Sequence, residues 1–164
     1  MSNFDILDYK IIDKETLAKR LAFWCATKEK IVFTNGCFDL LHQGHLSLLI
    51  EAASFGSQLI VGLNSDSSIR KIKGEHRPIQ DQQTRARVLA ALPFVSAVVL
   101  FDEETPGTLI KAVAPAVLVK GGDYKKEEIV GADIVEKNGG SVKIIDLLAG
   151  FSTSTLVEKI RKEA

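Results

Sequence analysis

Two histidines, His42 and His45, stand three residues apart in the stretch TNGCFDLLHQGHL, residues 34 to 46. At this spacing on a helix both imidazoles could bind one metal ion, or they could be core residues, helix caps or contacts for an anion. A zinc site needs at least a third ligand, and the remaining histidine, His76, lies in a polar segment. We therefore favour an anion contact, in which the missing side chain of Gly44 lets a phosphate approach a helix start.

A second group of basic residues follows in RKIKGEHR, residues 70 to 77, which contains Lys71 and Lys73. Lysines in a polar loop are usually solvated. However, the chain has 21 basic and 21 acidic residues and a formal net charge of +0, so this cluster is a local concentration of positive charge. The balance gives no general attraction for nucleic acid or a membrane surface, and it indicates a small anionic partner instead.

The elements that must position these residues follow from the hydrophobic pattern. Asp13 is a cap for the first long helix, Gly56 a C-terminal cap for the second, and Thr105 with Pro106 a start for a later one. The segment 64 to 78 is interpreted as a polar loop. The pattern predicts strands over 30–36, 58–64, 96–101, 115–122 and 138–148, and helices over 14–27, 45–56, 81–92, 107–114, 125–138 and 152–162.

Five strands that alternate with helices predict a single-domain Rossmann-like α/β fold, a five-stranded parallel sheet flanked by helices. At 164 residues the chain is one domain long, with residues 1–28 as an N-terminal arm and helix and residues 29–164 as the main domain. Cys25 and Cys37 are expected to be free thiols. No apolar run reaches the ~18 residues of a membrane span, and the N-terminus has no secretory pattern, so we expect a cytoplasmic protein.

Four polar clusters follow the first, second, fourth and fifth predicted strands, and they are NGCFDLLHQGH, NSDSSIRKIKGEHRP, KGGDY and GFSTS. Ligands of such folds bind at the carboxyl ends of the strands, where these clusters meet. Together they offer imidazoles, cations, backbone N–H groups freed by glycine and a helix start rich in hydroxyls, which suit phosphate. The chain has no Walker loop, dinucleotide fingerprint or G-x-S-x-G elbow, so the commonest nucleotide folds and serine hydrolases are disfavoured.

The chain resembles the cytidylyltransferase-like nucleotidyltransferases. GCFDLLHQGH is similar to their H-x-G-H signature, and GFSTS is similar to the second signature at the final helix. Within this family, VGLNSDSSIRKIKGEHRPI, VLAAL and LVKGGDY extend the resemblance to the heptose 1-phosphate adenylyltransferases over residues 28 to 160. The arginine that glycerol-phosphate cytidylyltransferases carry before the second signature is missing from LLAGFSTS, which favours the heptose branch.

The resemblance implies a role for each matching residue. His42, His45 and Lys73 would be catalytic, and Lys71, Lys73 and Arg85 would bind the sugar phosphate, with Arg85 facing the site from its helix. The nucleotide-binding residues would be Cys37, Phe38, Asp39, His42, Gly44, His45, Lys120, Gly121, Gly122, Asp123, Phe151, Ser152, Thr153 and Ser154.

The resemblance also implies a reaction, transfer of AMP from ATP to D-glycero-β-D-manno-heptose 1-phosphate with release of pyrophosphate. Mg²⁺ would be held mainly by the ATP phosphates, and the protein would be a homodimer. Two alternatives remain open from the residues. One is a cytidylyltransferase for glycerol 3-phosphate or another small phosphorylated alcohol or sugar, and the other is a nucleotide-binding regulator without turnover.

Overall fold

Five strands form one all-parallel sheet in the computed structural model, which describes residues 3–148 and 150–163. Their order across the sheet is β3-β2-β1-β4-β5, and β1 pairs with β2 along its whole length, from Ile31 opposite Gln58 to Gly36 opposite Leu63. The predicted α/β fold is therefore confirmed. The strands are β1 (Ile31–Gly36), β2 (Gln58–Asn64), β3 (Ala97–Phe101), β4 (Val117–Gly121) and β5 (Ser141–Ile145).

Helices connect the strands and cover both faces of the sheet. Among those described, none is long and apolar enough to cross a membrane. They are α1 (Asn3–Asp8), α2 (Lys14–Ala26), α3 (Gln43–Ser54), α4 (Asp66–Lys73), α5 (Gln82–Ala90), α6 (Gly107–Val113), the short 3₁₀ helix η1 (Lys126–Glu128), α7 (Ala132–Lys137) and α8 (Thr153–Glu163).

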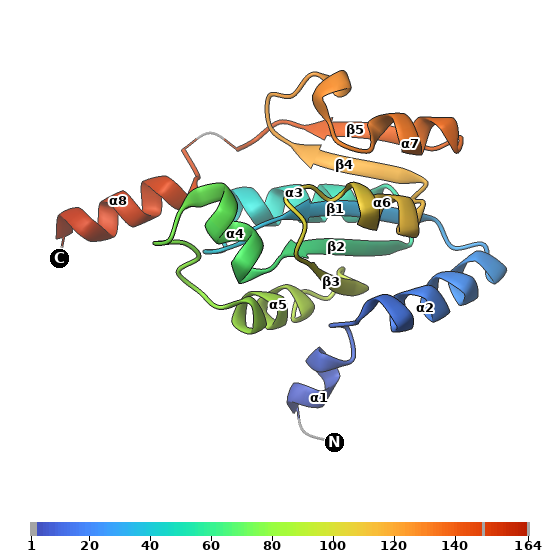
Figure 1. The fold of residues 1–164 in the computed structure, drawn as a ribbon, viewed down its shortest axis with the longest axis horizontal. Coiled ribbons are helices and arrows are strands. Elements are labelled where there is room, and N and C mark those ends of the chain that lie inside the picture. The colour runs from blue at the N-terminus through green and yellow to red at the C-terminus, as the bar shows by residue number, and fades with distance from the viewer. Residues whose placement is uncertain (1–2, 149, 164) are drawn as a thin grey trace.

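The hydrophobic core consists of two layers of buried side chains, one on each face of the sheet. Figure 1 shows the helices that cover these faces. One layer contains Leu17 of α2, Ile110 of α6 and Val135 of α7 packed on Phe33. The other joins α3 and α5 to residues that alternate with those of the first layer along the strands. This alternation arises because successive strand side chains point to opposite faces, and it makes the strands almost continuously apolar.

Several local predictions are confirmed and others are wrong. The Asp13 carboxylate accepts a hydrogen bond from the backbone N–H of Thr16 at the start of α2, as a cap should. By contrast, Pro106 rather than Thr105 occupies the cap position of α6, without a side-chain hydrogen bond. The α3 helix ends at Ser54, and a Cβ on Gly56 would lie 2.4 Å from the Lys30 carbonyl oxygen, so this glycine permits close packing instead of capping.

The largest difference from the predicted elements is α4, which lies within the predicted loop 64–78. Ser65 caps this helix by accepting from the backbone N–H of Ser68, and Ile69 is fully buried beneath it. The helix ends at Gly74, which has a positive φ of 91°. Similarly, the predicted helical region 125–138 is divided in two at Gly131, whose φ is 85°.

The N-terminal segment lies against the main body, as expected for an arm. The backbone N–H of Ile12 donates to the carbonyl of Val98 at 3.0 Å, and the N–H of Val98 donates to the carbonyl of Lys10 at 2.8 Å. Asp8 also forms a salt bridge with Arg87 of α5. These contacts attach the arm to the edge of the sheet formed by β3. The division of the chain at residue 28 stays a prediction.

The connections leave the sheet in opposite directions from its centre. From β1 the chain moves outward through α3 to β2, whereas α6 later carries it back across the sheet to β4 on the other side of β1. The connections therefore diverge at the carboxyl ends of β1 and β4, which creates the crevice in which ligands of such folds bind.

Candidate functional site

The two histidines lie together at the start of α3, just past the end of β1. Their rings are stacked, with centroids 3.8 Å apart and planes 23° from parallel. His42 is the N-cap residue, and its Nδ1 accepts from the backbone N–H of His45 at 3.4 Å, which fixes its ring orientation. Below them, Phe38 adopts a left-handed φ of 44° and places its ring 5.2 Å from that of His45. The pair is thus rigidly positioned at a helix N-terminus.

His45 has the most perturbed acid–base behaviour in this group. Burial is the main cause that lowers its pKa to about 4, followed by the charge of His42 and, more weakly, that of Lys73, whereas an interaction with the backbone of Leu40 opposes this shift. Burial also lowers the pKa of His42. At pH 7 His45 is therefore neutral, and its Nδ1 is a buried atom without a hydrogen-bond partner among the described residues. A buried ring nitrogen without a partner can form a hydrogen bond with a polar ligand that binds beside it.

Gly44 allows Phe151, which belongs to the second signature GFSTS, to lie close to the start of α3. A Cβ at this position would lie 3.1 Å from the His42 ring and 3.3 Å from the Cβ of Phe151. The ring of His42 and the side chain of Phe151, two residues before α8, thus leave little space for a side chain at Gly44. Room for a phosphate at this glycine stays a prediction.

The start of α8 offers hydroxyl groups beside this contact. Ser152 accepts from the backbone N–H of Thr155 at 3.0 Å, and their hydroxyls lie 2.7 Å apart. Thr153 and Ser154 form the first turn of the helix. Because the first backbone N–H groups of a helix have no partner within it, this end suits the phosphates of a nucleotide.

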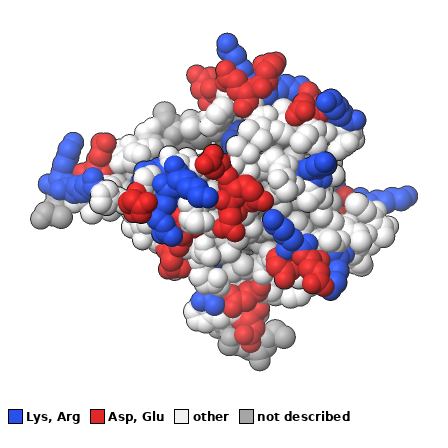
Figure 2. Space-filling model, in the orientation of Figure 1, with Lys and Arg blue, Asp and Glu red and all other residues white. Residues whose placement is uncertain are grey.

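Lys71 and Lys73 lie in the last turn of α4, both exposed. Being two residues apart, they do not share a helix face. The charge of Lys73 contributes to the low pKa of His45, whereas the charge of Lys71 contributes to the lowered pKa of Asp102. Figure 2 shows basic side chains gathered over α4, directly beside acidic ones. Of the two lysines, Lys73 is thus the one near the histidines.

A cavity of about 370 Å³ opens at the ends of β1, β2 and β4. Lys120 lies in its wall, where its Nζ donates to the Asn35 side chain at 3.1 Å and links the ends of β4 and β1. Burial lowers the pKa of Lys120. The other lining residues are Gly36, Cys37, Asn64, Ile72, Glu104, Thr105, Pro106, Tyr124, Glu128, Ile129 and Val130.

The two glycines of the KGGDY cluster lie at the end of β4 and directly after it. A Cβ on Gly121 would lie 3.1 Å from both Leu48 and Leu147, so the strand end packs closely against its neighbours. Gly122 has a φ of 132°, which turns the chain before the exposed Asp123. The turn leads directly to Tyr124, whose ring borders the cavity.

Arg85 does not face the open site, which corrects that expectation. Its side chain is fully buried, and its guanidinium donates to the carbonyls of Cys37, Asn64 and Gln80. It also forms a salt bridge with Asp66 at 2.7 Å. With its hydrogen bonds used internally, Arg85 joins the ends of β1 and β2 to the start of α4. It is a positioning residue rather than a direct phosphate ligand.

Asp39 is likewise buried instead of lining the pocket. Its carboxylate accepts from Arg77 Nε at 2.7 Å and from the backbone N–H groups of Ile79 and Gln80 at 2.9 Å each. Burial alone would raise the pKa of Asp39, but the hydrogen bonds from Gln80, Ile79 and Arg77 together lower it. Asp39 therefore fixes the segment that follows α4 to the loop after β1.

Replacing this carboxylate should destabilise the protein. In Asp39→Asn we expect the free energy of unfolding to fall by about 2–4 kcal/mol at pH 7, because the Arg77 charge loses its partner. Since the folded pKa of Asp39 is lowered, its contribution is present above the unfolded value near 3.8 and is lost as the pH falls further. Urea unfolding from pH 7 to pH 3 measures both effects, and the difference between the two proteins should shrink at the acid end.

The matched control is Asp133→Asn, which alters an exposed carboxylate 3.8 Å from Lys137. Such exposed pairs contribute little, so this variant should unfold within about 0.5 kcal/mol of the parent protein. If Asp39→Asn unfolded at the same urea concentration as this control, the role assigned to Asp39 would be wrong.

Sequence reasoning missed the asparagines that end two strands. Asn35 binds the Lys120 ammonium, and Asn64 donates to the hydroxyl of Ser68 at 3.0 Å while lining the same cavity. A signal was present, since each asparagine is the polar residue that closes an apolar strand run. Glu104 and Thr105, which follow β3, also line this cavity, although the sequence indicates only a helix start at Thr105.

Comparison with known proteins gives a family and close relatives. The model of the family described as "Cytidylyltransferase-like" matches residues 33–147. "Bifunctional protein HldE" of Azorhizobium caulinodans is 54% identical over 151 residues, which is 92% of this chain and 32% of that protein. The protein of the same name from Geobacter sulfurreducens is 50% identical over 155 residues, 94% of this chain and 32% of that protein. The chain thus spans about a third of the length of these relatives.

Solved structures agree with this fold. The lipopolysaccharide core biosynthesis protein from Thermoplasma volcanium is 28% identical with a TM-score of 0.60, covering 73% of this chain and 97% of that one. The pantoate-beta-alanine ligase of Francisella tularensis, in complex with a form of ATP and beta-alanine, has a TM-score of 0.64 at 18% identity, covering 93% of this chain and 76% of that one. At that identity it supports the fold alone.

Proposed function

Because this chain belongs to the cytidylyltransferase-like family, we propose that it is an adenylyltransferase that transfers AMP from ATP to D-glycero-β-D-manno-heptose 1-phosphate, giving ADP-heptose and pyrophosphate. One observation supports this most strongly, the stacked His42 and His45 at the start of α3, just past the end of β1. The identity of about 50% with the HldE proteins and the motifs of the heptose branch support the choice of substrates.

The reaction is an in-line displacement at phosphorus. An oxygen of the sugar phosphate attacks the α-phosphorus of ATP, and the bond from that phosphorus to the oxygen bridging to the β-phosphate breaks as pyrophosphate leaves. The attacking oxygen is already an anion, so no general base is required. The enzyme must instead bring two anions together and stabilise the crowded phosphorus centre.

The residues around the histidines suit that task. Neutral His45 would donate an N–H to an oxygen of the α-phosphate, and His42 would hold its neighbour in place and contact the triphosphate. Lys73 would supply a mobile positive charge from the end of α4. The start of α8, with Ser152 as its cap, would receive the nucleotide phosphates. All four features act by orientation and electrostatics.

A divalent cation fits this arrangement as a companion of the nucleotide. Among residues 3–148 and 150–163, no group of three or more His, Cys, Asp or Glu side chains is placed to hold a metal. Mg²⁺ commonly binds through substrate phosphates with few protein ligands, so the triphosphate would hold it mainly by itself. When bound, it would neutralise charge on the phosphates.

The 370 Å³ cavity is the proposed binding site for the sugar, so Cys37 and Lys120 would contact the sugar instead of the nucleotide that the resemblance implies for them. Its polar side chains can both donate and accept hydrogen bonds, as a ligand with many hydroxyl groups requires. Asn35, Asn64 and Glu128 would supply acceptors, and Lys120 would supply a donor. The ring of Tyr124 could pack on a sugar face.

The decisive experiment measures pyrophosphate release with ATP or CTP, each combined with heptose 1-phosphate or glycerol 3-phosphate, in the presence of Mg²⁺. We expect rapid release only with ATP and heptose 1-phosphate, together with an equal amount of ADP-heptose. A preference for CTP with glycerol 3-phosphate would establish the cytidylyltransferase alternative. Tight ATP binding without release from any pair would establish the regulator alternative.

The resemblance also supports two further parts of this proposal. The protein would act in the cytoplasm, and it would do so as a homodimer. Light scattering coupled to size-exclusion chromatography tests the second part, since a dimer would have twice the 17.9 kDa of the chain.

A further inference from the structure

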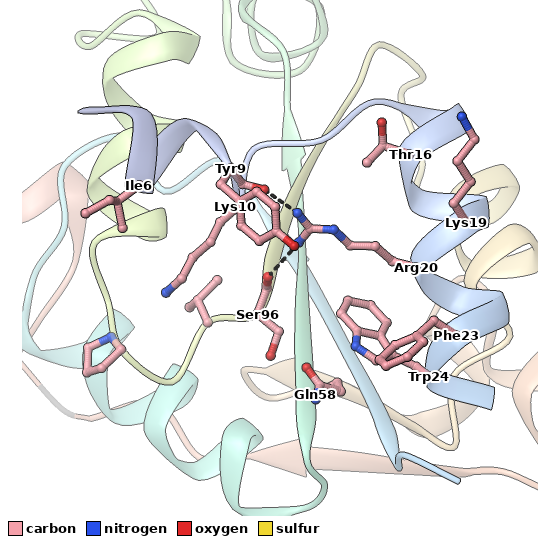
Figure 3. A pocket seen from close by; sticks show the side chains of 12 residues that line it. Ile6, Tyr9, Lys10, Thr16, Lys19, Arg20, Phe23, Trp24, Gln58 and Ser96 are labelled. Atoms are coloured by element: carbon pink, nitrogen blue, oxygen red, sulfur yellow. Dashed lines mark hydrogen bonds between the residues drawn. The ribbon is translucent and has the colours of Figure 1, made fainter. Parts of the chain in front are cut away.

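A second cavity lies at the opposite end of the sheet, where no part of the proposed reaction takes place. It has a volume of about 600 Å³ and lies between the N-terminal arm, α2 and the amino ends of β2 and β3 (Figure 3). This volume is in the usual range for small-molecule sites, roughly 300–1,000 Å³. The residues that line it are Ile6, Tyr9, Lys10, Thr16, Lys19, Arg20, Phe23, Trp24, Gln58, Pro93, Val95 and Ser96.

The charged residues of this cavity are all basic. Arg20 donates to the backbone carbonyls of Tyr9 and Ser96, and Lys10 donates to the carbonyl of Leu92 at 3.1 Å. Among the described residues neither cation forms an ion pair, while Lys19 pairs with Glu15 outside the cavity. Partial burial lowers the pKa of Lys10, as expected for a cation without a counter-charge. The lining of the cavity therefore carries positive charge without a paired carboxylate on Arg20 or Lys10.

The walls beside these cations are aromatic. The Arg20 guanidinium lies 4.2 Å from the centre of the Tyr9 ring. Tyr9 and Phe23 are 72% and 66% exposed, whereas Trp24 is buried at the base. Large aromatic side chains this exposed on opposite sides of one cavity form a surface on which a flat ring can stack.

From these observations we propose that this cavity is a binding site for a small anionic molecule with a flat ring. The anionic group would lie between Arg20 and Lys10, where it would provide the counter-charge, and the ring would pack against Phe23 and Trp24. Such a ligand would also connect the arm to α2, because Tyr9 and Lys10 belong to the arm.

The cavity is separate from the proposed reaction site. Gln58 begins β2, whereas Asn64 at the other end of that strand lines the sugar cavity. A strand of seven residues separates the two places by roughly 20 Å. A ligand bound here would not compete directly with the substrates, so the two proposals can fail independently.

The test uses Trp24, which is the only tryptophan of the chain, as its reporter. The probe is 1-anilinonaphthalene-8-sulfonate, and its uncharged analogue, N-phenyl-1-naphthylamine, lacks the sulfonate. We expect saturable quenching of Trp24 fluorescence by the sulfonate probe, with binding at least tenfold tighter than that of the uncharged analogue. Equal quenching by both compounds would overturn the proposal, because the site would then select for apolarity alone.

Two variants test whether the sulfonate group of the probe binds at Lys10 and Arg20. Lys10→Gln and Arg20→Gln should each weaken binding of the sulfonate probe by about tenfold, as expected for loss of a charge-assisted contact, and should leave the uncharged analogue unaffected. The matched control Lys111→Gln removes an exposed lysine of α6 and should bind like the parent protein. Far-UV circular dichroism checks that each variant is folded.

Two outcomes of this set would contradict the proposal. One is unchanged binding of the sulfonate probe in both Lys10→Gln and Arg20→Gln. The other is loss of quenching in His45→Ala, which would mean that the probe binds at the reaction site. Failure of the substrate experiments with probe binding intact would leave the second site standing.

Discussion

Removing the imidazole of His45 should abolish most of the turnover while the protein stays folded. In His45→Ala we expect kcat to fall by about 10²–10³, because a placed donor to the reacting phosphate is lost, and the KM for ATP to change little. The reason lies in the geometry, since His45 is partly buried, neutral at pH 7 and has an unpartnered Nδ1. Steady-state pyrophosphate release over a range of ATP concentrations separates the two parameters.

The control for this experiment is His76→Ala, which removes an exposed histidine after α4. It should retain nearly full turnover. Because the pKa of His45 falls from 6.5 to about 4 on folding, the parent protein should lose stability as the pH drops from 6.5 toward 4. His45→Ala should lose less over this range. A variant with kcat close to that of the parent would refute the catalytic role of His45.

Replacing Arg85 should have the largest effect on stability. In Arg85→Met we expect the free energy of unfolding to fall by about 3–5 kcal/mol, because the Asp66 carboxylate loses its partner and the carbonyls of Cys37 and Asn64 lose their donor. For a chain of this size that corresponds to a melting temperature lower by roughly 10 °C. Urea unfolding and calorimetry measure the two quantities.

A matched control exists on the same helix. Arg87→Met breaks a partly exposed pair with Asp8 and should destabilise the protein much less than Arg85→Met does. Arg85→Lys keeps the charge but cannot form the fork of hydrogen bonds, so it should recover only part of the stability. If Arg85 instead bound the sugar phosphate, Arg85→Met would raise the KM for that substrate without loss of stability, and the assigned role would be wrong.

The strands and most of the helices could be predicted from the sequence because interactions between residues close together in the chain specify them. The runs of apolar residues around Phe33, Ile60 and Leu118 are long enough to mark buried strands, and they alternate with helical stripes. The caps at Asp13 and Asp81 are equally local, since each carboxylate bonds to an N–H three residues later. The resemblance of the HQGH stretch to a known signature also predicted the family correctly, because that stretch is continuous in the sequence.

Failures occurred where a local pattern had two interpretations. The segment after β2 is rich in serine and lysine, which is typical of a loop, yet burial of Ile69 stabilises it as α4. Gly56 is followed by a strand and looks like a helix cap, although its real constraint is the Lys30 carbonyl, 26 residues earlier in the chain. In both cases the deciding contact is distant in sequence.

The sequence by itself thus determined the five strands, their alternation with helices and the chemical character of the sheet edge that carries His42 and His45. Only the tertiary structure decided which charged groups near that edge are free to meet a ligand. Arg85 and Asp39 carry the charge that a phosphate site could use, but burial and a complete set of internal hydrogen bonds make them supports for the loops. The type of a residue determines which bonds it can form, whereas the folded structure determines which of its possible partners lie within bonding distance.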